Sequence, residues 1–215
     1  MPMSALMTPP MRVRVCALIL AAGLGMIHAP ALVAEQTRGR VVWTPLFNGK
    51  TLAGWNQTGE SNWHVSDGMA VATTGTGMLV AGQPYKDFDL VAEMWVSAGA
   101  NSGIFFRGDD AVNVTPDTAY ELNLFDARPD PLYRTGAIVG ISSPLRRVDA
   151  GEHWNLIELS VRGPHIIAKI NGVVTVDTTD TRRDRSGVLA LQCSNGTVMI
   201  RRVDIRVPPT QAPRR

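Results

Sequence analysis

The chain has 215 residues, with 21 Lys and Arg, 19 Asp and Glu, and a formal net charge of +2. Hydrophobic residues make up 45% and charged residues 19%, a globular composition that argues against a largely disordered chain. So small a net charge also argues against a general nucleic-acid binder, because phosphate binding needs a dense basic face. The two cysteines allow at most one disulfide, which excludes a disulfide-rich scaffold.

The N-terminus has the pattern of a secretory signal peptide. Residues 1–34 contain no acid, and Arg12 and Arg14 precede a 13-residue apolar run that ends at Ile27 and is followed by small residues. The run is shorter than the roughly 20 residues of a membrane-spanning helix. We therefore expect a cleaved signal over 1–34, a linker over 35–41, and a periplasmic or secreted protein with no membrane contact. The alternative is an anchor that stays uncut.

Beyond the linker, short apolar or alternating runs are separated by Gly, Asn, Asp and Pro, which is typical of an all-β sandwich or barrel. Asn171-Gly172 predicts a tight hairpin turn. One domain is expected over 42–207, followed by a flexible tail over 208–215. The predicted strands are Trp63–Val65, Met69–Thr73, Phe88–Val96, Gly103–Arg107, Ala119–Asp126, Trp154–Val161, His165–Ile170, Val173–Asp177, Gly187–Cys193 and Thr197–Val207.

Strand alternation predicts which side chains share a face. Four strands each combine an apolar face with a second face of acids, amides, Arg and aromatics. Aromatic platforms beside hydrogen-bonding groups suit a sugar, which has apolar faces and a rim of hydroxyls. The alternative is the ordinary wet outer face of a sandwich. The side chains on the mixed faces are Glu93, Trp95, Phe105, Arg107, Glu121, Asn123, Phe125 and Gln192.

Several strings, taken in order, resemble the 3-keto-disaccharide hydrolase domain family. They are Leu46–Trp55, Trp63–Gly68, Tyr85–Leu90, Asn101–Arg107, Tyr120–Asp126, Thr135–Ile138, Gly151–Asn155, Ile170–Gly172 and Gly187–Gln192. The resemblance implies an all-β, concanavalin A-like jelly-roll sandwich of two antiparallel sheets, with little or no helix and a ligand site on the concave face or its rim. It also implies a substrate that is a glycoside already oxidised to a ketone at carbon 3.

That ketone determines the chemistry that the family implies. It acidifies the proton on carbon 2, because the resulting anion spreads onto the carbonyl oxygen. A base removes the proton, the group at carbon 1 leaves, and water adds back. Such a site needs a base, a positive or hydrogen-bond-donating group at the enolate oxygen, and an acid for the leaving group.

Glu121 is the first candidate for the base, and Glu93 is the second. Either could instead be a surface carboxylate or part of a salt bridge between strands. Arg107 could stabilise the enolate oxygen, or it could form a buried ion pair with Glu93 or Glu121.

Further residues of these strings are candidates for substrate binding. Trp95 could stack on a sugar ring, although a Trp is more often in the core. Asp126 could orient a loop instead of binding sugar, and Asn101 could form a turn. The remaining candidates for binding hydroxyl groups are Asn123, Gln192 and His153.

Three positions depart from the family pattern. Members commonly carry Gln at Asn123, an aromatic residue at Val139, and a His-Gly pair near Asn195. Loss of a catalytic or metal-binding histidine would leave a non-catalytic carbohydrate-binding jelly roll, and both functions stay open from the sequence. An interaction domain that meets another protein is a third, weaker hypothesis.

Metal binding also stays open. Asp109 and Asp110 lie in a loop whose oxygens could hold Ca²⁺ or another divalent cation, although no dense ligand set accompanies them. The expected partner is a small sugar or 3-keto-glycoside. A hydrolase of this kind would also need a separate glycoside 3-dehydrogenase to make the ketone. A charge-balanced mature chain suits an uncharged ligand, since Arg12 and Arg14 leave with the signal.

Overall fold

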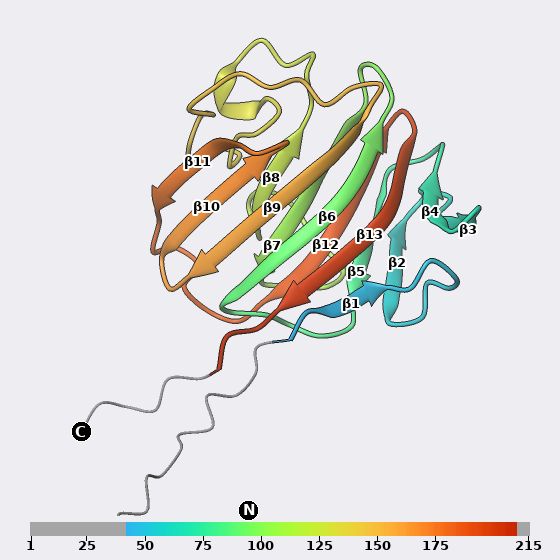
Figure 1. Cartoon of the computed structure of the whole chain (residues 1–215), viewed down its shortest axis with the longest axis horizontal. Helices are drawn as coiled ribbons and strands as arrows, with labels where there is room; N and C mark the ends of the chain where they lie inside the picture. The colour runs from blue at the N-terminus through green and yellow to red at the C-terminus, as the bar shows by residue number, and fades with distance from the viewer. Residues whose placement is uncertain (1–41, 210–215) are drawn as a thin grey trace, which may run out of the picture. The chain divides into compact units, whose positions relative to one another are not determined.

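Two antiparallel sheets packed face to face form the part of the chain that the computed structural model describes, residues 42–209 (Figure 1). The signal peptide and linker predicted before Val42, and the tail from residue 210, lie outside the described residues.

Sheet A is the larger sheet. Its order is β11 (Val173–Thr179), β10 (His165–Ile170), β9 (Trp154–Arg162), β6 (Phe88–Val96), β13 (Val198–Arg206), β4 (Met69–Ala72) and β3 (His64–Ser66), with β1 (Thr44–Phe47) also against β13. Sheet B has the order β2 (Trp55–Gly59), β5 (Gly77–Ala81), β12 (Val188–Asn195), β7 (Asn101–Gly108) and β8 (Tyr120–Leu124).

The hydrophobic core lies between the sheets. In β6, Phe88, Leu90 and Met94 are fully buried, while the alternate residues face away from sheet B. In β8, Leu122 points into the same core and Glu121 points out on the other side. Each sheet therefore has an inner face in the core and an outer face, and the predicted alternation is confirmed in β6 and β8, whereas a bulge interrupts it at Arg107 of β7.

The predicted strands are all present, and three further strands were not predicted. β1 contains Pro45, which cannot donate a ladder hydrogen bond and weakens a strand pattern. β2 is mostly polar, and β5 is a continuous apolar run because both of its faces are covered. The predicted hairpin is confirmed, since Asn171 and Gly172 adopt φ values of 53° and 78° between β10 and β11.

Helical structure is nearly absent from residues 42–209. The one helical element described is the 3-10 turn η1 (Pro131–Tyr133), which Asp130 caps through its side chain. Nowhere in this part of the chain does a helix have the length and apolarity needed to cross a membrane.

A short segment extends sheet B beyond β8. The Val139 amide donates to the Glu121 carbonyl at 3.0 Å, and the Gly136 amide donates to the Asn123 carbonyl at 2.9 Å. Ile138 pairs with Leu122 and is buried in the core. By alternation, Val139 therefore lies beside Glu121 on the outer face of sheet B.

Candidate active site

Glu121 lies on the outer face of sheet B, and only 5% of the residue is exposed. Across β7 its partner in register is Phe105, and the next residue on that face is Gly103. A Cβ atom on Gly103 would stand 2.9 Å from Glu121 Oε1. The carboxylate therefore lies over β7 in the space that this glycine leaves open.

The electrostatics of Glu121 are those of a carboxylate without partners. Among the described residues, none donates a hydrogen bond to it. Burial raises the pKa of Glu121 to about 8, and the positive charge of Arg128 offsets only part of that rise. Its neighbours Phe105 and Val139 are apolar. A carboxyl group with a pKa near neutrality is suited to taking and returning a proton.

Two amide side chains lie in the next row of the same face. Gln192 and Asn123 are the register partners of Gly103, one on each side. Gln192 Oε1 and Asn123 Oδ1 are buried and have no hydrogen-bond partner within the part of the chain that the structure describes. Asn123 Nδ2 donates to the Tyr133 carbonyl at 2.7 Å. The predicted grouping of Glu121, Asn123 and Gln192 is present, and it offers two unpaired acceptors for hydroxyl groups.

Asn101 begins β7 on the same face and is half-buried. It is in register with Asn195 of β12, whose Nδ2 donates to the Gly99 carbonyl at 3.3 Å. Asn195, one of the positions that depart from the family pattern, therefore lies at the end of this face, three residues along β12 from Gln192 and beyond a bulge.

Arg128 is a candidate that the sequence interpretation missed. It follows β8 in the chain, is exposed, and has its guanidinium carbon 5.3 Å from the centre of the Phe125 ring. It makes no ion pair with any residue described between 42 and 209, yet its charge acts on Glu121. The sequence signal for Arg128 is only that a basic residue follows the strand of Glu121. It lies in a loop, and a loop has no periodicity from which the direction of a side chain could be predicted.

Arg107 does not join this group. Its φ of 53° accompanies a bulge between β7 and β12, and its side chain is completely buried. It bonds Asp87 at 3.0 Å and the Lys86 carbonyl at 2.9 Å, and Asp184 lies at 3.7 Å. Arg107 therefore forms a buried ion pair, as the alternative interpretation predicted. Its partners are Asp87 and Asp184 and not Glu93 or Glu121.

Glu93 and Trp95 lie on the outer face of sheet A. Glu93 pairs with Arg201 and Arg202, and Trp95 is the register partner of Trp154. The thickness of the sandwich, roughly 10 Å between sheets, separates them from Glu121. Glu93 and Trp95, named from the sequence as candidates for the base and for stacking on a sugar, therefore do not lie on the same face as Glu121, because alternation predicts the side of a strand but not the sheet to which the strand belongs.

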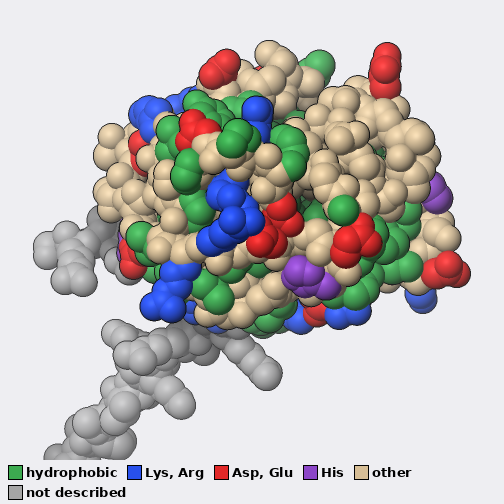
Figure 2. All heavy atoms as spheres, turned by 90° about the horizontal axis from the view of Figure 1, so that it is seen from above, with side chains coloured by type: hydrophobic (Ala, Val, Ile, Leu, Met, Phe, Trp, Pro, Cys, Tyr) green, Lys and Arg blue, Asp and Glu red, His purple; other side chains and the backbone are tan. Residues whose placement is uncertain are grey.

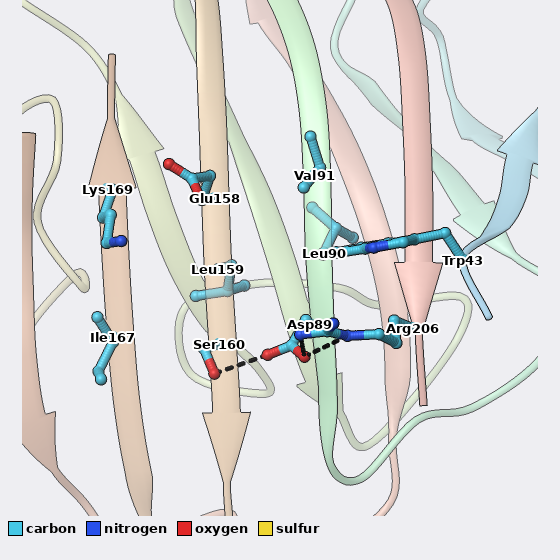
Figure 3. Close-up of a pocket in the computed structure, with 10 residues that line it drawn as sticks. All are labelled: Trp43, Asp89, Leu90, Val91, Glu158, Leu159, Ser160, Ile167, Lys169 and Arg206. Carbon is cyan, nitrogen blue, oxygen red and sulfur yellow. Dashed lines mark hydrogen bonds and ion pairs between the residues drawn. The ribbon is translucent and has the colours of Figure 1, made fainter. Parts of the chain in front are cut away.

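A groove of about 210 Å³ does lie on the outer face of sheet A (Figure 3). Asp89 accepts hydrogen bonds there from Ser160 at 2.8 Å and from Arg206 at 2.6 Å, and the Arg206 guanidinium lies 4.9 Å from the centre of the Trp43 ring. Arg162 also pairs with Asp89 at 2.6 Å. The central polar groups of this groove bond one another.

Asp126 and His153 lie in the loops between β8 and β9. The space-filling view of one end of the sandwich shows acidic and basic side chains side by side (Figure 2). Asp126 accepts from the Thr135 hydroxyl and from the Ala150 and Gly151 amides. It orients a loop, as the alternative for this residue predicted. His153 is exposed, with a ring nitrogen 2.8 Å from the Gly151 carbonyl.

Within residues 42–209, no three His, Cys, Asp or Glu side chains are grouped so that they could hold a metal ion. Asp109, considered for a calcium loop, forms ion pairs with Arg183 and Arg185.

Known proteins share this architecture. A candidate glycosyl hydrolase from Parabacteroides distasonis superposes with a TM-score of 0.69 at 19% identity, over 76% of this chain and 93% of that one. The carbohydrate-binding module CBM66 from Bacillus subtilis superposes with a TM-score of 0.58 at 13% identity, over 72% and 96%. At these identities the likeness concerns the fold alone, and the predicted concanavalin-like jelly roll is confirmed.

Sequence comparison gives a narrower result. The chain is 31% identical over 86 residues to a 3-keto-disaccharide hydrolase of Bacteroides thetaiotaomicron, covering 34% of this chain. The match spans only 29% of that relative's length. Residues 42–206, nearly all of the described structure, match the model of one family. The chain therefore belongs to the 3-keto-alpha-glucoside-1,2-lyase-like domain family.

Proposed function

We propose that the outer face of sheet B is the active site of an exported, carbohydrate-active enzyme that cleaves 3-keto-glycosides. The observation that carries the proposal is Glu121, a buried carboxyl group to which no residue between 42 and 209 donates a hydrogen bond, and whose pKa burial raises to about 8. Membership of the family and the name of its curated relative support the substrate class.

The reaction begins with Glu121 taking the proton from carbon 2. The electron pair of that C–H bond moves onto the oxygen at carbon 3 and forms an enolate. The carbonyl then re-forms, a double bond appears between carbons 1 and 2, and the bond from carbon 1 to the leaving oxygen breaks. The leaving oxygen takes up a proton through solvent as Glu121 gives up the proton that it accepted. Water adds its hydroxyl to carbon 1 and its proton to carbon 2, so the net change is hydrolysis.

Burial makes Glu121 a stronger base than an ordinary surface carboxylate, because it raises the pKa of this group from 4.5 to about 8. Arg128 is the cation available to stabilise the enolate oxygen. Gln192, Asn123 and Asn101 would bind hydroxyl groups of the sugar. Glu93, Trp95 and Arg107 take no part, because their contacts lie elsewhere in the molecule.

The proposal requires a second enzyme. That enzyme must oxidise the carbon-3 hydroxyl, so a functional link to a glycoside 3-dehydrogenase is part of the proposal. Export through the predicted signal peptide would place the reaction in the periplasm or outside the cell.

A divalent cation could add positive charge at the enolate oxygen. The test below therefore includes divalent metal and chelator.

The test incubates the purified protein with a 3-keto-glucoside in deuterated water, with divalent metal or with chelator. NMR follows sugar release and deuterium at carbon 2. We expect both in the wild type and a loss of about 10²–10⁴-fold in Glu121→Gln, the usual contribution of a general base. Glu93→Gln is the matched control and should keep full activity. Undiminished release by Glu121→Gln would remove Glu121 from the mechanism.

A second candidate is a carbohydrate-binding domain without turnover. Asn195 stands where the family pattern has a histidine near this face. The three histidines within residues 42–209 have other surroundings: His64 lies near the Asn62 carbonyl, His153 near that of Gly151, and His165 pairs with Asp177. Measurable sugar binding without release or carbon-2 exchange, with and without metal, would favour this candidate.

A further inference from the structure

The loop between β7 and β8, residues 109–118, has one buried residue. Val114 is 6% exposed, whereas Val112 and Asn113 before it are exposed. Val114 packs into a small apolar cluster on the outer face of sheet B, apart from the main core between the sheets. The other members of this cluster are Met78, Val80, Phe105, Ala119 and Ala190. The loop therefore folds back over the face on which Glu121 lies.

Two members of the cluster are neighbours of Glu121. Phe105 is its register partner on β7, and Ala119 precedes it by two residues on the same face. In the other direction along β8, the next residue on this face is Asn123, whose Oδ1 has no partner within residues 42–209. The cluster that Val114 completes thus forms the apolar side of the carboxylate, and the row of Asn123 forms its polar side.

Hydrogen bonds and ion pairs fix the base of the loop. The Asp109 amide donates to the Thr118 carbonyl at 2.9 Å, and the Thr118 hydroxyl donates to the Asn113 carbonyl at 2.7 Å. The Asp109 carboxylate pairs with Arg183 at 2.6 Å and also with Arg185. The loop is therefore held at its base independently of its one buried residue.

Shielding from water matters for a carboxylate that takes a proton from carbon, because water stabilises the charged form and weakens the base. Burial raises the pKa of Glu121 to about 8, and Arg128 is the charged group among residues 42–209 that acts against this rise. The acids of the loop, Asp109, Asp110 and Asp117, make no contribution to this pKa. The side chains that neighbouring elements present to Glu121 are uncharged, namely Phe105, Gln192 and Val139. The basicity of Glu121 therefore depends on its apolar cover.

We propose that Val114 is a positioning residue that acts through Glu121: it closes the apolar side of the carboxylate against water, so that the loop of residues 109–118 belongs to the active site. The proposal rests on the function proposed above. Substrate reaches Glu121 from the side of Asn123, and Val114 closes the opposite side.

The test compares Val114→Ser with Val112→Ser, which makes the same change at a 78% exposed position of the same loop. NMR of isotope-labelled glutamate follows the titration of the Glu121 carboxyl group from about pH 4 to 10 without substrate, and Glu121→Gln assigns the signal. Val114→Ser should lower the midpoint by about 1 pH unit, because water beside the carboxylate stabilises its charged form. Val112→Ser should keep the wild-type midpoint, and so should Val114→Ile, which retains an apolar cover. None of these changes touches the main core, so the circular dichroism spectra should be alike.

Turnover of a 3-keto-glucoside gives the second measurement. In Val114→Ser, the pH of half-maximal kcat should fall by the same amount while KM stays unchanged, because Val114 lies away from the amides that bind the sugar. A lowered midpoint without any sugar release would support the cover and remove only the catalytic proposal. Release that depends on Glu121, together with an unchanged midpoint in Val114→Ser, would overturn the cover and leave the catalytic proposal standing.

Discussion

Asp89 and Glu121 are both largely buried carboxyl groups, one on the outer face of each sheet, and their surroundings differ completely. Burial would raise the pKa of Asp89, but hydrogen bonds from Ser160, Arg206 and Arg162 outweigh it and lower the pKa. Glu121 receives no such bond from the residues that the structure describes, and burial raises its pKa to about 8. Both residues are less than 10% exposed, yet their pKa values shift in opposite directions, because Asp89 has donors that favour its charged form.

The difference extends to the whole of the two outer faces. On sheet A, Asp89 and Glu93 are matched by arginines that arrive from neighbouring strands. On sheet B, Glu121 is flanked by apolar side chains, and among residues 42–209 the acceptors of Gln192 and Asn123 have no donor. Buried polar groups without partners cost stability, which is the pattern expected of a face that serves the function proposed above.

Substitutions of Arg107 and Arg128 should differ most, because the first should reduce stability and the second should reduce turnover. Arg107→Met removes the buried guanidinium that pairs with Asp87 and Asp184 and donates to the Lys86 and Arg183 carbonyls, so we expect a loss of about 3–5 kcal/mol in the free energy of unfolding. Guanidinium chloride unfolding followed by circular dichroism measures it. Arg128→Met should stay within about 0.5 kcal/mol while its turnover falls roughly 10²-fold. Stable Arg107→Met protein with lost turnover would reverse the two assignments.

Glu121 should make the protein less stable as the pH rises. The pKa of Glu121 is higher in the folded protein than its unfolded value of 4.5. Its stabilising contribution to the free energy of unfolding is therefore fully present below pH 4.5 and is lost as the pH passes 8. Between pH 6 and 9 the wild type should lose roughly 2–4 kcal/mol that Glu121→Gln retains. Urea unfolding at both pH values tests this, and parallel profiles for the two proteins would contradict it.

Asp89 should have the opposite effect on the pH dependence of stability, since it stabilises the protein as the pH rises. Its folded pKa lies below 3.8, so its contribution is present above that pH and disappears as the pH falls through the folded value. Asp89→Asn should cost roughly 1–3 kcal/mol at pH 7 and change turnover little. Equal losses at pH 7 and at strongly acidic pH would show that the ionised form contributes nothing.

Trp95 should give the smallest effect. Trp95→Ala removes a half-buried side chain from the outer face of sheet A, and we expect a loss of about 1 kcal/mol with unchanged sugar binding and turnover. Isothermal titration with substrate or sugar measures the binding. A large loss of affinity would mean that sugar binds on sheet A as well, and the contrast between the faces would fail.

Local patterns predicted the fold well. Period-two alternation placed Glu121 with Asn123 and Glu93 with Trp95, and the Asn171-Gly172 pair placed a hairpin. These signals depend on neighbours in the chain. The choice of sheet depends on distant partners: β6 joins β9 and β13, whereas β7 joins β8 and β12. For that reason the sequence could not divide the candidate residues between the two faces.

Two arginines show the other reasons for failure. Arg107 adopts a left-handed conformation at a bulge, which breaks the alternation that the sequence argument assumes. Arg128 lies in a loop, where no periodicity applies, and its importance appears only through its charge near Glu121.

The position of β12 has a consequence for how the protein acquires its site. This strand is next to last in the chain, yet it lies at the centre of sheet B, between β5 and β7. The row that contains Gln192 cannot close until nearly the whole chain is present, and such distant pairings make folding slow. A chain that ends before Val188 would expose the unpaired edges of β5 and β7, which are templates for aggregation. The outer face of sheet B, the proposed active site, is therefore among the last parts of the molecule to assemble.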